Sequence, residues 1–233
     1  MELERRNPFT GLKVVAPVDE DDNGVSFEYG EVRTLLGKTG SINDELQDIV
    51  RILACTGARL AEISGLQVKD FDTKAQSISI EFNDIRRLKN KASIRVVPVV
   101  DAKALEALRK RAEGRPPAES IFPKYGWDKG ANSASAALSQ RLTTIGLRDP
   151  RSAKPKTTHS LRHTFKDALR DVGVLDDIRN MIHGHTAGDE ASKYGSNELL
   201  ERKREAAEKV WKLYFKKPQV SRAILKTPLL ARR

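Results

Sequence analysis

The sequence has few of the residues that stabilise secreted and membrane proteins. Cys55 is the only cysteine among 233 residues, which rules out an internal disulfide and is typical of a reducing cytosol. It lies in the apolar run IVRILACTG, where we expect a core position. No apolar run has the roughly 20 residues of a membrane span, and the N-terminus does not look like a signal peptide. The sequence predicts a soluble, cytoplasmic protein.

Acidic side chains are fewer than basic ones. The chain has 32 Asp and Glu against 42 Lys and Arg, a formal net charge of +10 and an isoelectric point near 9.7. Such an excess favours a polyanionic partner. Nucleic acid is a better candidate than a membrane surface, because no long basic amphipathic helix dominates the sequence.

Hydrophobic periodicity predicts an α+β fold that is mainly helical, with one small antiparallel sheet. The clearest helix runs from Ser41 to Thr56, with an apolar stripe, Ser41 or Asn43 as its cap, and a stop at Gly57. Alternating residues in QSISIEF and SIRVVPVV predict two strands of a hairpin joined by a basic connection. Further helices are predicted near residues 28–40, 59–66, 101–114, 131–146, 158–171, 176–183 and 197–215.

All four histidines of the chain fall within residues 157–194, a stretch that ends in a tyrosine. If THSLRHTF begins a helix, His159 and Arg162 lie three residues apart on one face. Cationic and protonatable side chains together with a phenol suit chemistry on an anion, and the basic composition favours a phosphodiester. Its cleavage requires cations around the phosphate, a nucleophile and an acid for the leaving oxygen.

Several motifs in this chain together resemble the tyrosine recombinase (phage integrase) family. They are TGARLAEISGLQ, LKNKASIRVVPV, THSLRHTF and a Gly-His pair nine residues before Tyr194. They follow the order and spacing of the family from about Ile42 to Tyr194. The resemblance implies a catalytic domain that breaks and rejoins DNA through a 3′-phosphotyrosyl intermediate, without metal or ATP. It also implies double-stranded DNA as partner, a tetramer on DNA, a monomer as an isolated domain, and DNA-bending accessory proteins.

The resemblance gives a role to each matching residue. Arg59 and Arg162 match the two arginines that clamp the phosphate. Glu62 matches an acidic position that supports the first arginine, and an ordinary salt bridge between Arg59 and Glu62 is the alternative. His159 matches a general acid or base, whereas His163 is expected to pack beside the site.

Two assignments leave alternatives open. Lys89 matches the hairpin lysine that protonates the leaving 5′ oxygen, and Lys91 competes with it because both fit the connection. His185 matches the donor to a non-bridging oxygen. His183, which stands where the family usually has leucine, is the alternative donor. Tyr194 matches the nucleophile.

The resemblance divides the chain into three parts. Residues 1–25 correspond to an interdomain linker or arm and 26–197 to the catalytic domain. Residues 198–233 form a C-terminal helix and basic tail, docked on the same domain or exchanged between protomers. Family members usually carry a core-binding domain before the catalytic one. We expect this chain to be an isolated catalytic fragment, or the arm to be supplied elsewhere, so that DNA binding by the chain alone is weak and falls steeply with salt.

Three other functions account for fewer of these residues. A metal-dependent hydrolase would use His159 and His163, four residues apart on one helix, but the glutamate of an HExxH motif is missing. A non-catalytic DNA-binding module would bind DNA without forming a covalent adduct. A type IB topoisomerase shares the chemistry and would relax a supercoiled plasmid that lacks any specific site.

Excess EDTA separates the metal-dependent hydrolase from the recombinase. We expect DNA cleavage to persist in EDTA, because attack by a phenol exchanges one phosphodiester for another and needs no metal. Strand breaks on a denaturing gel measure the reaction. Cleavage that disappears in EDTA would favour the hydrolase.

Overall fold

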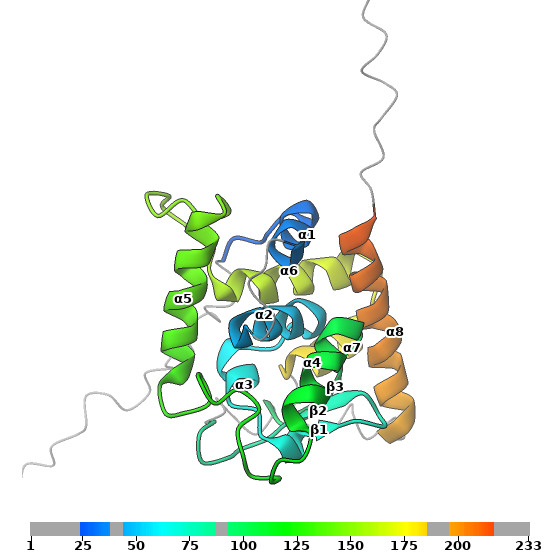
Figure 1. The fold of residues 1–233 in the computed structure, drawn as a ribbon. Coiled ribbons are helices and arrows are strands. Elements are labelled where there is room, and N and C mark those ends of the chain that lie inside the picture. The colour runs from blue at the N-terminus through cyan, green and yellow to red at the C-terminus, as the bar shows by residue number, and fades with distance from the viewer. Residues whose placement is uncertain (1–23, 38–43, 87–92, 186–195, 217–233) are drawn as a thin grey trace, which may run out of the picture.

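The computed structural model of this chain describes residues 24–37, 44–86, 93–185 and 196–216. Within them, helices surround a central helix, α2 (Glu45–Thr56), and a small sheet lies at one end of the helical body (Figure 1). The helices around it are α1 (Tyr29–Gly37), α3 (Leu60–Ser64), α4 (Ala102–Ala112), α5 (Gly130–Thr144), α6 (Thr158–Asp171), α7 (Asp176–His183) and α8 (Ser196–Phe215).

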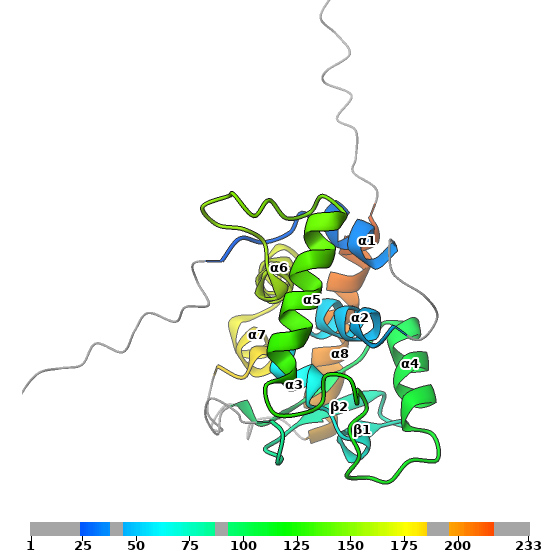
Figure 2. The same cartoon turned by 60° about the vertical axis from the view of Figure 1, so that its left-hand side comes forward.

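Helix α2 organises the core. It packs against α1, α3, α4, α5, α6 and α8, and Figure 2 shows α6 and α7 on one side of it and α4 on the other. Its predicted apolar stripe is buried, as expected from the spacing. Among the described helices, none has the length and apolar content needed to span a bilayer.

The ends of α2 show one wrong prediction and one that is confirmed. The cap is Asp44, whose carboxylate accepts the Leu46 N–H at 3.0 Å, and not Ser41 or Asn43, which lie outside the described residues. Asp44, the residue after Asn43, satisfies one of the backbone N–H groups that lack a partner in the first turn of a helix. Gly57 ends the helix as predicted, with φ 64° and its N–H donating to the Leu53 carbonyl at 3.0 Å.

The sheet is antiparallel, with the order β1-β2-β3. The predicted hairpin strands are confirmed as β2 (Ser77–Ile80) and β3 (Arg95–Pro98). The additional strand β1 (Phe71–Asp72) was not predicted, because two residues are too few to show an alternation. The connection with Lys89 and Lys91 lies outside the described residues.

Helix α8 packs on the body of the same chain, against α1, α6 and β3. Lys203 is buried and donates to the Val96 carbonyl of β3 at 3.1 Å, and Arg204 donates to the Ala75 carbonyl. Burial and the nearby Arg95 guanidinium lower the pKa of Lys203 to about 8. The apolar face of α8 is thus covered within one chain, mainly through Ala206, Ala207, Val210 and Tyr214.

Replacing Gly57 by alanine should destabilise the domain more than the same change at Gly146. Both glycines have positive φ, 64° and 77°, so each substitution brings backbone strain of about 1–2 kcal/mol. At Gly57 the added Cβ would lie 2.5 Å from the Phe165 ring, whereas at Gly146 nothing lies within 4 Å. We expect an additional loss of about 1–3 kcal/mol in unfolding free energy for Gly57→Ala, measured by urea denaturation. Equal losses would mean that Phe165 moves aside without cost.

Candidate active site

Arg162 is a buried arginine that bridges three segments of the chain. Its guanidinium donates to the Gly57 carbonyl through Nη1 and to the His183 carbonyl through Nη2, each at 2.9 Å. The Nη2 atom also lies 2.9 Å from Nε2 of His185. Arg162 is only 3% exposed, and its guanidinium is held in place by the end of α2 and the end of α7.

The start of α6 sets the position of Arg162. Thr157 caps the helix, because its Oγ1 accepts the His159 N–H at 3.2 Å while the Ser160 hydroxyl accepts the Thr157 N–H at 3.0 Å. His159 lies one helical turn before Arg162, on the same face. The predicted helix and the shared face of the two residues are therefore confirmed.

Glu62 and Arg59 occupy the start of α3. Arg59 is the N-cap residue, and its backbone N–H donates to Glu62 Oε2 at 2.7 Å. Its side chain adds a longer contact, with Nη1 3.3 Å from Glu62 Oε1. The Glu62 side chain is 4% exposed and that of Arg59 is 24% exposed. The Arg59 side chain is therefore partly open to solvent, whereas that of Glu62 is buried.

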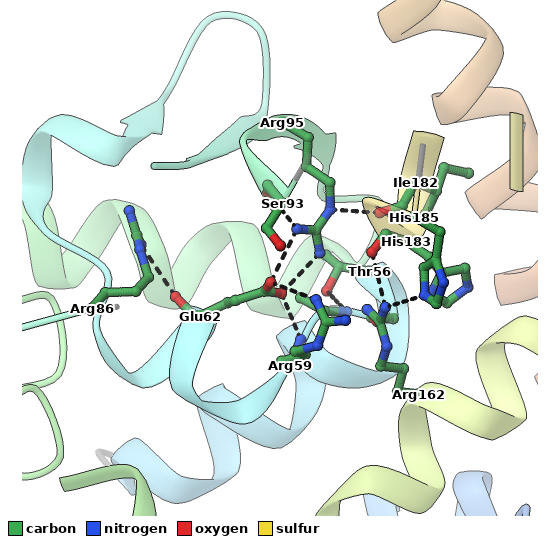
Figure 3. Close-up of polar contacts among 12 residues, drawn as sticks. Thr56, Arg59, Glu62, Arg86, Ser93, Arg95, Arg162, Ile182, His183 and His185 are labelled. Atoms are coloured by element: carbon green, nitrogen blue, oxygen red, sulfur yellow. Dashed lines mark hydrogen bonds and ion pairs between the residues drawn. The ribbon is translucent and has the colours of Figure 1, made fainter. Parts of the chain in front are cut away.

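Arg95 on β3 is a second and stronger partner of Glu62, and no sequence motif assigned it a role. Its Nη2 lies 2.8 Å from Glu62 Oε2 and its Nη1 lies 3.1 Å from Oε1, a bidentate pair (Figure 3). The Nε group donates to the Ile182 carbonyl at 2.7 Å, and Nη1 also donates to the Ser93 carbonyl at 2.8 Å. Arg95 therefore connects α3, α7 and the residues just before β3.

The alternation of residues along this strand is the sequence signal from which the burial of Arg95 could be predicted. In the strand SIRVVPVV, residues two apart share a face, so Arg95 falls on the same face as Val97 and Val99. Both valines are buried, and Arg95 is buried beside them. A buried arginine requires an anionic partner. The alternation thus places Arg95 on the inward face of the strand, but it does not identify the anionic partner.

The charge of Glu62 is fixed by its neighbours. Burial by itself would raise the pKa of the carboxyl, but the Arg95 guanidinium, the Arg59 backbone N–H and the Arg162 charge lower this pKa to about 2. Glu62 is therefore ionised at every pH at which the domain is expected to work. Behind it, Arg86 is fully buried, donates to the Glu62 carbonyl at 3.2 Å and pairs with Asp70.

The two histidines at the end of α7 have different surroundings. His183 is 2% exposed, its ring packs edge-on to Phe165, and neither ring nitrogen has a hydrogen-bond partner among the described residues. Burial and the nearby charges of Arg162 and His185 keep the pKa of His183 well below its ordinary value. His185, by contrast, presents Nε2 to Arg162. Of the two candidate donors, the geometry favours His185.

His159 and His163 lie against each other on α6. Their ring centroids are 4.7 Å apart and the rings are nearly perpendicular. His163 is buried, and the chain passes closely over it, since a Cβ at Gly24 would meet its ring. These contacts agree with the packing role expected for His163.

The structure brings together four predicted site residues, Arg59, Glu62, Arg162 and His185, and places His159 one helical turn from Arg162. Three others, Lys89, Lys91 and Tyr194, lie outside the described residues. Among the described residues, no group of three or more His, Cys, Asp or Glu side chains is arranged to hold a metal ion.

The fold is that of the catalytic domains of tyrosine recombinases. The chain belongs to the phage integrase family, whose sequence model matches residues 29–199.

Its relatives include proteins of transposons and phages. The transposase from transposon Tn916 of Enterococcus faecalis is 26% identical over 202 residues, which cover 78% of this chain and 50% of that protein. The integrase from mycobacterium phage Brujita superposes with a TM-score of 0.55 and 19% identity, over 86% of this chain and 61% of that one. For the Tn1549 transposon integrase in complex with transposon right end DNA, the TM-score is 0.58 with 21% identity, over 78% and 65% of the chains. The chain spans about half the length of the curated relatives that it matches.

His183 makes the stability of the domain depend on pH. Because its pKa in the folded state lies well below the ordinary 6.5, the unfolded chain binds a proton that the folded chain does not. Protonation of the unfolded chain therefore lowers the free energy of unfolding as the pH falls below about 6.5, whereas above that pH the His183 ring is neutral in both states. We expect wild type to lose up to about 1.4 kcal/mol per pH unit below pH 6.5 relative to His183→Leu.

Urea denaturation of both proteins at pH 5, 6 and 7 measures the difference. At pH 7 we expect His183→Leu to be more stable by about 1 kcal/mol, because leucine places no unsatisfied ring nitrogens in the core. Parallel pH dependences for the two proteins would contradict a neutral, buried His183.

Proposed function

We propose that this chain is the catalytic domain of a site-specific DNA recombinase. It cleaves and rejoins double-stranded DNA through a 3′-phosphotyrosyl intermediate. The observation that carries the proposal is the guanidinium of Arg162, fixed by two backbone carbonyls and directed at His185 beside a partly exposed Arg59. The family supports the same reaction class.

The phosphate is bound by the side chains that the fold fixes in advance. Arg59 and Arg162 contact the non-bridging oxygens, because a planar guanidinium can donate to two oxygens of one phosphate. His185 donates to a non-bridging oxygen through Nδ1, because its Nε2 faces Arg162, which can only donate. Donors that are already fixed need no reorganisation as negative charge builds up in the transition state. Glu62 fixes the backbone of Arg59 at 2.7 Å and makes only a longer contact, 3.3 Å, with its guanidinium.

The reacting groups are Tyr194, His159 and Lys89. The phenolic oxygen of Tyr194 attacks phosphorus, and the bond from phosphorus to the 5′ oxygen breaks. His159 accepts the phenolic proton, and Lys89 donates a proton so that the 5′ oxygen leaves as a neutral hydroxyl. One diester replaces another, so the reverse reaction with a different DNA end rejoins strands without metal or ATP.

The DNA substrate is a site that belongs to a mobile element. The Tn916 and Tn1545 relatives are named as transposases of transposons, and a structural neighbour was solved with transposon right end DNA. The protein acts on this DNA in the cytoplasm, as a tetramer assembled on two sites, with accessory proteins that bend the DNA. Alone, the domain is monomeric and binds DNA weakly, because it lacks the second half of the clamp around the duplex. Its affinity then comes mainly from phosphate contacts and falls steeply with salt.

The proposed function assigns a role to each of three parts of the chain. Residues 1–25 are an interdomain linker or arm, and 26–197 form the catalytic domain. The segment 198–233 follows the nucleophile, and its helix α8 is covered by its own chain. In the tetramer on DNA, this segment either stays on its own domain or is exchanged between protomers.

A library of nicked DNA duplexes with random sequence tests the reaction even though the target site is not identified. A nick close to the cleavage position lets the short fragment with the 5′ hydroxyl diffuse away and traps the covalent adduct. We expect SDS-resistant protein–DNA adducts with wild type, and sequencing of the trapped DNA gives the preferred site. Tyr194→Phe should form none, whereas Tyr29→Phe, a partly exposed control, should form them normally.

The arginine contacts are tested on the sequence that the library yields. We expect Arg59→Ala to lower the single-turnover rate at least about 100-fold, as is usual for loss of one transition-state donor. A folded Tyr194→Phe protein that still forms adducts would exclude this nucleophile. Strand breaks without any adduct would favour hydrolysis.

A substrate with sulfur in place of the bridging 5′ oxygen decides between Lys89 and Lys91. A thiolate leaves without protonation, because the pKa of a thiol is only about 8.5. We expect Lys89→Ala to cleave ordinary DNA about 100-fold or more slowly and the sulfur-containing DNA at nearly the wild-type rate. Lys91→Ala should cleave both at nearly the wild-type rate, and the opposite pattern would assign Lys91 as the acid.

A further inference from the structure

The Glu62 carboxylate accepts four N–H groups, which is close to the full capacity of a carboxylate. The Arg95 fork occupies both oxygens, at 2.8 and 3.1 Å. The backbone N–H of Arg59 donates to Oε2 at 2.7 Å, and the Arg59 side chain contributes the longest contact, 3.3 Å to Oε1. Two arginine side chains therefore share one buried anion, and Arg95 has the better geometry.

This sharing matters because Arg59 has two possible anionic partners. One is the phosphate that it binds in the proposed reaction, and the other is Glu62, three residues away on the same helical turn. A buried carboxylate without a full set of donors strongly attracts a guanidinium. Glu62 is ionised, since its pKa is about 2. Whatever satisfies Glu62 decides how strongly Arg59 is drawn to it.

We propose that Arg95 is a positioning residue: by occupying both oxygens of Glu62, it leaves the Arg59 guanidinium able to bind the phosphate. The inference rests on the proposed function, since it concerns the clamp on the same phosphate. Arg95 acts through Glu62, whose Oε2 accepts from both Arg95 Nη2 and the backbone N–H of Arg59.

Arg95 also holds the second arginine of the clamp at a fixed distance from the first. Its Nε group donates to the Ile182 carbonyl, and the next carbonyl along the chain, that of His183, accepts from Arg162. Arg162 in turn donates to Gly57, two residues before Arg59. Figure 3 shows these contacts around Glu62 and Arg95. Loss of Arg95 therefore affects both sides of the phosphate site.

Other charged groups near Glu62 do not replace Arg95. Arg86 donates to the backbone carbonyl of Glu62, and its side chain is paired with Asp70. Arg162 lowers the pKa of Glu62 through its charge, but its Nη groups donate to carbonyls of other residues. When Arg95 is removed, Arg59 is the guanidinium already in contact with the carboxylate.

A double-mutant cycle tests the inference in the full chain. The variants are Arg95→Met, which fills the space with a flexible apolar side chain, Glu62→Gln, and the double variant. Arg95→Lys keeps the positive charge but lacks the planar fork that meets both carboxylate oxygens at once. The first readout is the single-turnover rate of adduct formation at saturating protein, on the DNA selected from the nicked library. Thermal unfolding of each variant shows that it is folded at the assay temperature.

We expect Arg95→Met to slow adduct formation about 100-fold, the scale expected for a misplaced group. The double variant should recover at least about tenfold of this loss, because Glu62→Gln removes the charge that attracts Arg59. Arg95→Lys should lie between wild type and Arg95→Met. A purely structural role predicts the opposite for the double variant, a rate no higher than that of the slower single variant. That result would overturn the inference.

Inorganic phosphate gives a second readout that does not depend on recombination. In wild type, phosphate should shift the side-chain NMR signal of Arg59, assigned by its loss in Arg59→Lys. Arg95→Met should weaken this response at least about tenfold, and the double variant should restore it. If wild type forms no adduct while this phosphate pattern appears, the proposed function fails and the role of Arg95 holds.

Folding of the variants is controlled separately. If Arg95→Met does not fold, the comparison of Arg95→Lys with Glu62→Gln/Arg95→Lys carries the same test, because lysine retains the charge of the buried pair. A phosphate response of Arg59 that is the same in wild type, in the Arg95 variant and in the double variant would overturn the inference, whatever the adduct assay gives.

Discussion

The buried ion pair between Arg95 and Glu62 is the contact on which the candidate site depends. Removing either partner would leave a charge in the protein interior, which is far more costly than losing an exposed salt bridge. Through this pair the contacts form a closed circuit, from Arg59 to Glu62, Arg95 and the end of α7, then to Arg162 and back to Gly57. A closed circuit restrains both arginines of the proposed clamp relative to each other.

The end of the central helix completes this circuit. Gly57 adopts a left-handed conformation that ends α2, and its carbonyl then accepts from Arg162. A side chain at this position would meet the Phe165 ring of α6. The same residue thus allows the close approach of α6 and supplies an acceptor for a buried guanidinium. Both the packing of the core and the position of Arg162 therefore depend on Gly57.

The site also contains a group that burial leaves unsatisfied. Neither ring nitrogen of His183 has a hydrogen-bond partner among the described residues, and its surroundings are positively charged. Such an arrangement lowers stability. The backbone carbonyl of His183, however, has a partner, because it accepts a hydrogen bond from Arg162. The position therefore depends on its main chain more than on its imidazole.

Much of this protein follows from the sequence alone. The apolar stripe of α2, the stop at Gly57, the hairpin strands and the shared face of His159 and Arg162 are local patterns, and periodicity and capping rules recover them. The family follows from motifs in order along the chain, and the same motifs predict the candidate site residues.

Only the tertiary structure could show which partner Glu62 has. The sequence paired it with Arg59, three residues away, whereas its bidentate partner Arg95 is 33 residues away on β3. Contacts of that kind depend on how helix and strand pack, and neither the spacing nor the residue types of one segment encode them. In the same way, only the tertiary structure shows that the ring of His185 lies against Arg162, whereas the nitrogens of His183 have no hydrogen-bond partner among the described residues.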